Sequence, residues 1–335
     1  MSGAPLVSVI IPNYNYAHVL EHCLRAVQAQ TYSPLEIVLV DDGSTDDSVQ
    51  VAQRLGVPVI HTPSNSGVAA ARNLGAQRAR GEILFFLDSD VALDPGAIAA
   101  AVATLESDPG IGAVCGNYEP VPLIRDSLVK EYRNLFHHYY WLAAEGSAEF
   151  LVPALFAMPR RVWNEVGPFS EHLLQTEAAS IAQRLTERYE IRLTSTIRGR
   201  HDDDPTLRVA LRKVFTRTRM QVPFFLQRRY AAGVIGSQES RASLFAALTL
   251  TALPLPLVTG LPAVAGLSLL SLAYYLFIDR RMYRFVFRSR SVPFGVFFTA
   301  THFLVNLTIA AGAGIGILQW LTSRSFRRLY LEAPA

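Results

Sequence analysis

An apolar segment that ends in two acidic residues restricts the fold of this chain more than any other feature. Residues 83–87 have the composition of a buried strand, and Asp88 and Asp90 follow it two positions apart. Carboxylates at the end of a buried strand cost free energy unless a cation or hydrogen-bond donors lie beside them. Open α/β sheets bind ligands at the ends of their parallel strands. The pair could therefore hold a hard divalent cation and a diphosphate, or it could form a turn in which Asp90 caps the next helix.

Strand and helix patterns alternate over about the first 200 residues. Apolar runs typical of strands occupy residues 6–11, 36–40, 57–61, 83–87, 111–115, 151–158 and 191–193. Helical spacing of apolar residues occupies 17–28, 68–80, 95–106 and 124–145. This alternation predicts an α/β fold with a mostly parallel sheet and helices on both of its faces.

Charge, the amino terminus and the cysteines limit the cellular setting. The formal net charge is only +3, which gives no overall field for nucleic acid, so no nucleic-acid partner is expected. The chain starts with a strand pattern rather than a basic and apolar signal segment, which predicts a cytoplasmic location for this region. Cys23 and Cys115 lie within a helical and a strand pattern, as core residues of a reducing compartment do.

Four short motifs occur in the same region. They are VSVIIPNYN at 7–15, VDDGSTD at 40–46, GVAAARNLG at 67–75 and LDSD at 87–90. In order and spacing they resemble the motifs of family-2 glycosyltransferases, and the resemblance covers about residues 6–201. It implies a GT-A fold, which is Rossmann-like, and the inverting transfer of a sugar from a nucleotide-sugar donor.

The resemblance implies a nucleotide site made of residues from all four motifs. These residues are Pro12, Tyr14, Asp41, Asp42, Arg72 and Asp88. A carboxylate such as Asp42 can accept a hydrogen bond from an N–H of uracil or guanine, and a UDP-sugar is favoured over a GDP-sugar. Tyr14 could pack against the base. The alternatives are a strand-to-helix turn for the two aspartates at 41 and 42 and a surface arginine at 72.

The resemblance also implies a divalent metal, Mg²⁺ or Mn²⁺. Asp90 and Asp88 would be its ligands, with His201 as a further candidate that could instead contact the diphosphate or be a loop histidine. The metal would act as a Lewis acid on the diphosphate leaving group. The three aspartates at 202–204 are interpreted as a solvated turn ahead of a helix that begins near Thr206.

The position of the catalytic base departs from the pattern of the family. The family supplies it as the aspartate of a Glu-Asp pair that precedes an arginine by six residues. Here Glu177 and Ala178 take those places before Arg184, and alanine cannot accept a proton. Three readings follow: Glu177 is the base, the chain is an impaired relative that only binds the donor, or the acceptor is already ionised. Glu177 could also simply cap its helix.

Residues 205–243 are rich in arginine and are expected to form amphipathic helices on an anionic membrane surface. A solvated basic face is the alternative. Arg184, Arg212 and Arg217 are assigned to the side of an acceptor or its phosphate.

Two long uncharged runs follow, at 244–278 and 292–321. A single straight helix of 35 residues would extend about 50 Å, beyond a hydrocarbon core of about 30 Å. We therefore expect a transmembrane region at 244–335, with a turn near 259–262 and spans at 244–260, 262–278 and 292–321. Two single spans, or a buried helical soluble domain, are the alternatives.

The expected protein is therefore anchored in an inner or plasma membrane, with a cytoplasmic catalytic domain at 1–204. The arginine-rich stretch at 279–290 is expected to be a loop on the cytoplasmic side. The acceptor would be lipid-linked or a polysaccharide. Gly312, Gly314 and Gly316 predict close helix contact, within the chain or between copies in a homo-oligomer. A transporter is disfavoured because the spans are few and contain no acid or base except His302.

Overall fold

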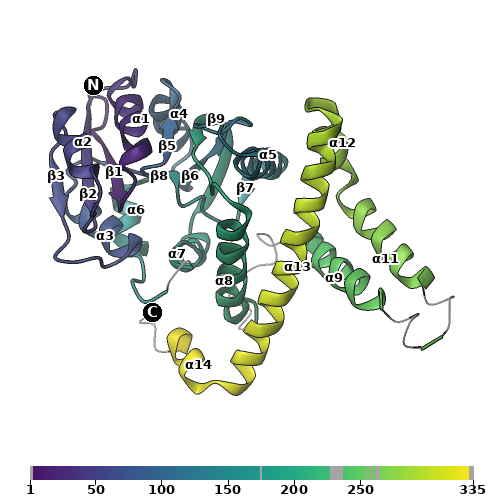
Figure 1. Cartoon of the computed structure of the whole chain (residues 1–335). Coiled ribbons are helices and arrows are strands. Elements are labelled where there is room, and N and C mark those ends of the chain that lie inside the picture. The colour runs from purple at the N-terminus through teal and green to yellow at the C-terminus, as the bar shows by residue number, and fades with distance from the viewer. Residues whose placement is uncertain are drawn as a thin grey trace. The chain divides into compact units, whose positions relative to one another are not determined.

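The computed structural model describes residues 3–173, 176–226, 237–254, 256, 259–260 and 265–331. The chain divides into two compact units, Met1–Asp203 and Asp204–Ala335, whose elements are labelled in Figure 1.

The described part of the N-terminal unit contains a nine-stranded mixed sheet covered by helices. Its strands are β1 (Val7–Asn13), β2 (Leu35–Asp41), β3 (Val59–His61), β4 (Ile83–Leu87), β5 (Val91–Leu93), β6 (Ile111–Tyr118), β7 (Gly146–Ala148), β8 (Leu155–Pro159) and β9 (Glu190–His201). The strand order is β3-β2-β1-β4-β8-β6-β9-β5, and β7 pairs with β9. Strands β3, β2, β1 and β4 are parallel, as the alternation predicts, whereas β8 is antiparallel to both of its neighbours.

The helices of this unit bury their apolar faces against the sheet. They are α1 (Ala17–Gln28), α2 (Ser48–Arg54), α3 (Val68–Arg78), α4 (Ala97–Ser107), α5 (Leu128–Ala143), α6 (Arg160–Val166) and α7 (Glu177–Thr186). In α1 the buried stripe has helical spacing, which explains why its bounds match the predicted helix. In α3 a side chain at Gly75 would come within 2.5 Å of Ile10, so the glycine allows this helix to lie close to β1. The α/β fold class is thus confirmed.

Three strands differ from the sequence prediction. β5 and β7 have three residues each and were not expected, because so short a segment has no periodicity to detect. β9 runs for 12 residues rather than the three predicted at 191–193. Its second half pairs with β5, where Val91 lies opposite His201. This pairing brings the end of β9 to the end of β4.

The C-terminal unit is helical in its described part. Its helices are α8 (Leu207–Leu226), α9 (Ser237–Ala252), α11 (Ala265–Ile278), α12 (Arg280–Ser289), α13 (Val292–Thr322) and α14 (Arg324–Leu331). The arginine-rich stretch expected to be a loop is therefore mostly the helix α12. Among the described residues, α13 alone is long and apolar enough to cross a membrane, by length and composition, while α9 and α11 have shorter apolar parts. The expected turn at 259–262 lies partly outside the described residues.

Of the three glycines at 312, 314 and 316 in α13, two make the close contact that the sequence predicts. A side chain at Gly312 would come within 2.9 Å of the Phe215 carbonyl of α8, and one at Gly316 within 2.7 Å of the Arg219 carbonyl. Gly314 has nothing within 4 Å of such a position, so it makes no such contact within the chain.

Candidate active site

A cavity of about 270 Å³ opens where β1, β2 and β4 end. Because these strands are parallel, their carboxyl ends share one edge of the sheet, and the segments that follow them meet there. The cavity is lined by Pro12, Asn13, Tyr14, Tyr16, Asp42, Asn65, Gly67, Val68, Ala71, Asp88, Ser89 and Asp90. Five predicted site residues, Pro12, Tyr14, Asp42, Asp88 and Asp90, therefore lie together, and they come from three separate segments of the chain.

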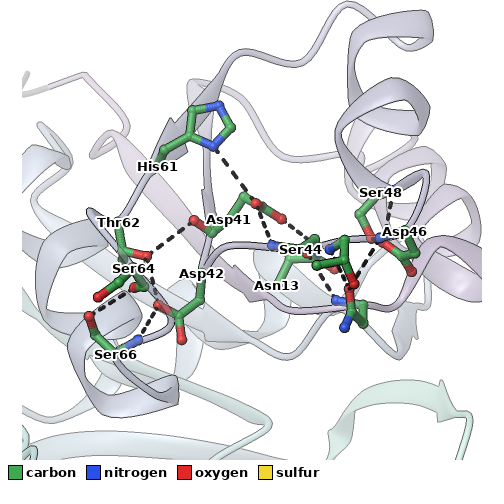
Figure 2. Close-up of polar contacts among 12 residues, drawn as sticks. Asn13, Asp41, Asp42, Ser44, Asp46, Ser48, His61, Thr62, Ser64 and Ser66 are labelled. Atoms are coloured by element: carbon green, nitrogen blue, oxygen red, sulfur yellow. Dashed lines mark hydrogen bonds and ion pairs between the residues drawn. The ribbon is translucent and has the colours of Figure 1, made fainter.

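Asp42 ties the end of β2 to the turn before α3, as Figure 2 shows. One carboxylate oxygen accepts hydrogen bonds from the Thr62 hydroxyl at 2.7 Å and the Ser66 amide at 2.9 Å. The other oxygen accepts the Gly67 amide at 2.7 Å. Gly67 has φ +92°, a conformation that suits glycine, and it starts α3 beside the cavity. Asp42 is therefore fixed in place while it lines the cavity.

Asp41 lies behind the cavity rather than in its wall. Its oxygens accept hydrogen bonds from the Asn13 side-chain amide at 3.0 Å and the Ser44 amide at 3.0 Å. Its Oδ2 also lies 3.7 Å from Nδ1 of His61 (Figure 2). In this structure Asp41 shapes the turn after β2 and supports its neighbour Asp42.

Arg72 is buried beneath the cavity and bridges two acids. Its guanidinium donates to Asp88 Oδ1 at 2.7 Å and to Glu177 Oε1 at 3.2 Å. Burial and the neighbouring Asp90 raise the pKa of Asp88, although Arg72 acts in the opposite direction. Arg72 is thus neither a surface arginine nor a residue of the cavity wall, and it couples the acidic pair to α7.

Glu177 is the first residue of α7 and is buried. Its Oε1 accepts from Arg72, whereas its Oε2 is buried without a hydrogen-bond partner. Ala178 follows it in the same turn and is half-buried. The ion pair holds the carboxylate of Glu177 in one orientation and leaves its other oxygen without a hydrogen-bond partner.

Asp90, the second residue of the acidic pair, contacts His201. His201 Nε2 lies 3.5 Å from Asp90 Oδ2, and its Nδ1 lies 3.4 Å from Asp203 Oδ2. The ring stacks on Tyr118 at 4.5 Å between centroids. Burial alone would lower the pKa of His201, but the two aspartates outweigh it and raise the pKa to about 10. A protonated imidazole pairs with carboxylates, and it must lose its proton before it can bind a metal.

The three aspartates at 202–204 are buried, so their interpretation as a solvated turn was wrong. Basic side chains compensate their charge: Lys130 donates to Asp202 at 2.8 Å, and Arg133 donates to Asp203 at 3.0 Å. Both donors lie on α5 and are distant in sequence. Without such partners, buried carboxylates would destabilise the folded state strongly.

The residues at the acidic pair suit a divalent cation in chemistry. Asp90 Oδ1 is buried and has no hydrogen-bond partner, and carboxylate oxygens are the donors that Mg²⁺ and Mn²⁺ prefer. The described residues contain no group of three or more His, Cys, Asp or Glu side chains arranged to hold a metal. A cation here would therefore take part of its coordination shell from a diphosphate, as Mg²⁺ commonly does.

Three other predicted residues do not line the cavity. Arg184 donates to the Pro168 carbonyl at 2.8 Å and so holds the turn before α7. Arg212 and Arg217 are exposed on α8 of the other unit. Sequence reasoning did not assign Asn65 and Val68 to the site. The sequence feature that could have indicated them is the turn at Gly67, which begins α3 close to the end of a strand.

A mixed α/β sheet with an acidic pair at its edge defines a GT-A-like fold. Residues 8–167 match the model of the Glycosyl transferase family 2. The mannosyltransferase PcManGT from Pyrobaculum calidifontis, solved with GDP-Man and Mn²⁺, has a similar fold with a TM-score of 0.58 and 19% identity. That likeness covers 96% of this chain and 89% of PcManGT.

Curated relatives agree with this class. An uncharacterized glycosyltransferase of Haemophilus influenzae is 41% identical over 91 residues, which are 26% of this chain and 36% of the relative. The glycosyltransferase AglE of Haloferax volcanii is 29% identical over 212 residues, 61% of this chain and 69% of AglE. The chain thus spans about a third of the length of the first relative. Together the matches support a glycosyltransferase.

Proposed function

We propose that the chain is a membrane-anchored, inverting glycosyltransferase that moves a sugar from a nucleotide-sugar donor to a lipid-linked or polysaccharide acceptor. Residues 1–204 would form the catalytic domain, 205–243 an interfacial segment and 244–335 the membrane region. The observation that carries the proposal is the cavity that gathers Tyr14, Asp42 and the acidic pair Asp88 and Asp90.

The free hydrogen-bonding capacity of Asp42 supports a UDP-sugar as the donor. A carboxylate has about four lone-pair sites, and three of them accept from Thr62, Ser66 and Gly67. One site remains, which suits the single ring N–H of uracil better than the two adjacent donor groups of guanine. Tyr14 is 42% exposed at the rim, so its ring is accessible for packing on a base.

Asp90 and Asp88 are the residues that would hold a divalent cation, and His201 could join them as the neutral imidazole. When bound, the cation would offset the charge that develops on the diphosphate leaving group. The chain's own contribution is to keep two carboxylates at one edge of the sheet. Arg72 orients the carboxylate of Asp88.

Glu177 is the proposed base. Arg72 fixes one of its oxygens, and the other is free to take the proton of an acceptor hydroxyl as the sugar is attacked from the face opposite the diphosphate. An acceptor that is already ionised, such as a lipid phosphate, would need little help from it. The competing function is donor binding without turnover, which Ala178 favours.

The membrane anchor rests on the C-terminal unit. The apolar helix α13 has 31 residues, and the arginine side chains of α12 lie exposed on one side of that helix. A basic amphipathic helix beside an apolar one is typical of a membrane surface. We place the protein in an inner or plasma membrane with the catalytic domain in the cytoplasm, where nucleotide sugars are made.

Release of free nucleoside diphosphate from a panel of UDP- and GDP-sugars tests the proposal. The chain is purified in detergent and assayed with Mn²⁺ and a lipid phosphate or oligosaccharide acceptor. Asp90→Asn should lower the rate about 100-fold or more, because charge on the leaving group is no longer offset. Asp94→Asn is the matched control, since the Asp94 side chain is 40% exposed and its carboxylate pairs with the exposed side chain of Arg198. Equal rates for the two variants would contradict the proposal.

Two further variants separate catalysis from binding. Glu177→Gln should slow release by about 10² to 10⁴ if Glu177 is the base, because glutamine keeps the shape but cannot take a proton. If the donor binds without release and Ala178→Asp creates release, the chain is the impaired relative instead.

A further inference from the structure

An apolar groove in the C-terminal unit has no part in the proposed sugar transfer. It has a volume of about 780 Å³, within the range of about 300–1,000 Å³ that ligand sites occupy. Its walls come from α11, α12 and α13, which Figure 1 labels. The lining residues include Leu272, Leu276, Arg280, Val296, Ala300 and Leu304.

The walls expose large apolar side chains that the chain itself does not cover. Leu272, Leu276 and Leu304 are between 36% and 42% exposed, and Val296 is 58% exposed. At the α12 end, Phe287 packs against Gly295, where a side chain would come within 2.4 Å of the ring. This contact sets α12 against the start of α13 and leaves the space beneath it open. A hydrocarbon chain matches such a surface.

The polar groups around the groove are satisfied, with one exception. Tyr283 donates to the Tyr275 hydroxyl at 3.0 Å, and Thr299 donates to its own helix at the Gly295 carbonyl. Among the described residues that line the groove, Arg280 alone carries a charge. It donates once to the Phe277 carbonyl at 3.0 Å and lies 3.9 Å from the centre of the Phe277 ring. A guanidinium has five donors, so most of them remain for a ligand.

The positive charge on and around Arg280 favours an anionic ligand. Arg281, Arg284 and Arg288 are exposed on the same helix, and Asp279 at its start is buried beside His302 at 3.3 Å. The groove therefore combines apolar walls with one cationic side chain. We propose that it binds one acyl chain of an anionic bilayer phospholipid, whose phosphate pairs with Arg280. The proposal rests on the membrane location given above.

Retention of lipid by the full chain tests this site without any nucleotide sugar. The protein is reconstituted in vesicles of equal parts phosphatidylcholine and phosphatidylglycerol, extracted in mild detergent, and its bound lipid is counted by mass spectrometry. We expect close to one phosphatidylglycerol per chain. Arg280→Gln should lower its retention about fivefold, the factor for the roughly 1 kcal/mol that one arginine contributes near an anionic surface. Arg281→Gln, one residue along the helix, should not.

A second pair of variants tests the channel itself. Ala300→Phe places a ring inside the groove and should abolish retention of both lipids, whereas Ala311→Phe, at an exposed position about three turns further along the same helix and outside the groove, should leave it intact. Equal retention of phosphatidylcholine and phosphatidylglycerol by the wild type would overturn the proposal. Equal retention of phosphatidylglycerol by the Arg280 and Arg281 variants would also overturn it, as would equal lipid retention by the Ala300 and Ala311 variants. Nucleoside diphosphate release is measured separately, so the two proposals fail independently.

Discussion

Arg72 is the side chain that connects the parts of the candidate active site. It is 2% exposed and donates to both Asp88 and Glu177. Arg72→Met should destabilise the chain by about 3–5 kcal/mol, because two buried carboxylates lose their cation. Arg78→Met changes an exposed arginine of the same helix and should cost far less. The midpoint of thermal unfolding in detergent measures both, and similar midpoints would mean that the ion pairs contribute little.

His137 should make the stability depend on pH. Only 16% of its side chain is exposed, and it is surrounded by Arg133, Asp203 and His201. Burial and Arg133 lower its pKa from 6.5 to about 4. Between these values the unfolded chain binds a proton that the folded chain does not, so stability is lost as pH falls from about 6.5 towards 4.

The size of this effect can be bounded and tested. The full shift corresponds to at most about 3 kcal/mol. His137→Gln should reduce the drop in melting temperature between pH 7 and pH 5, whereas replacement of the exposed His22 should not. An unchanged pH dependence in His137→Gln would show that this histidine is protonated in the folded protein.

Single residues show where sequence reasoning succeeds. Tyr14, Asp42, Asp88 and Asp90 could be predicted because each follows a strand that the apolar pattern reveals, and parallel strand ends meet. The burial of Asp202 and Asp203 could not be predicted, because their partners Lys130 and Arg133 are about 70 residues away. Arg72 was assigned to the nucleotide for the same reason: its position on α3 was visible and its acidic partners were not.

At the scale of elements, the contact between α8 and α13 depends on glycine. Gly316→Ala should destabilise the C-terminal unit by about 1–3 kcal/mol, because the added carbon meets the Arg219 carbonyl and Val222, each at 2.7 Å. Gly314→Ala should instead stabilise it by up to about 1 kcal/mol, since that position is open and alanine favours helix. Opposite shifts in unfolding temperature are expected, and shifts of the same sign would contradict this packing.

Long elements could be predicted and short ones could not. The bounds of α1 follow from its apolar stripe, and β4 follows from five consecutive apolar residues. β5 has only three residues and no periodicity, yet its pairing with β9 carries His201 to Asp90. The part of the site that involves His201 therefore depends on an element with no local signal. α12 was missed because its arginines suggested a loop.

For the whole molecule, composition and the long uncharged runs predicted a C-terminal part unlike the rest. The chain does divide at Asp203, and α13 has the length and apolarity of a membrane span. Sequence could not fix the number of spans, since apolar runs interrupted by proline are consistent with several helix boundaries. The layout of catalytic, interfacial and membrane segments remains a proposal for the whole protein.

Binding of UDP measured by calorimetry, with and without Mn²⁺, tests the central claim most directly. If the cavity beside Asp42, Asp88 and Asp90 binds a nucleoside diphosphate through a divalent cation, UDP should bind with Mn²⁺ present. Affinity should fall about tenfold or more when Mn²⁺ is omitted or when Asp90 is changed to asparagine, and Asp94→Asn should leave it unchanged. Binding that is equally tight without the metal and in Asp90→Asn would contradict the account.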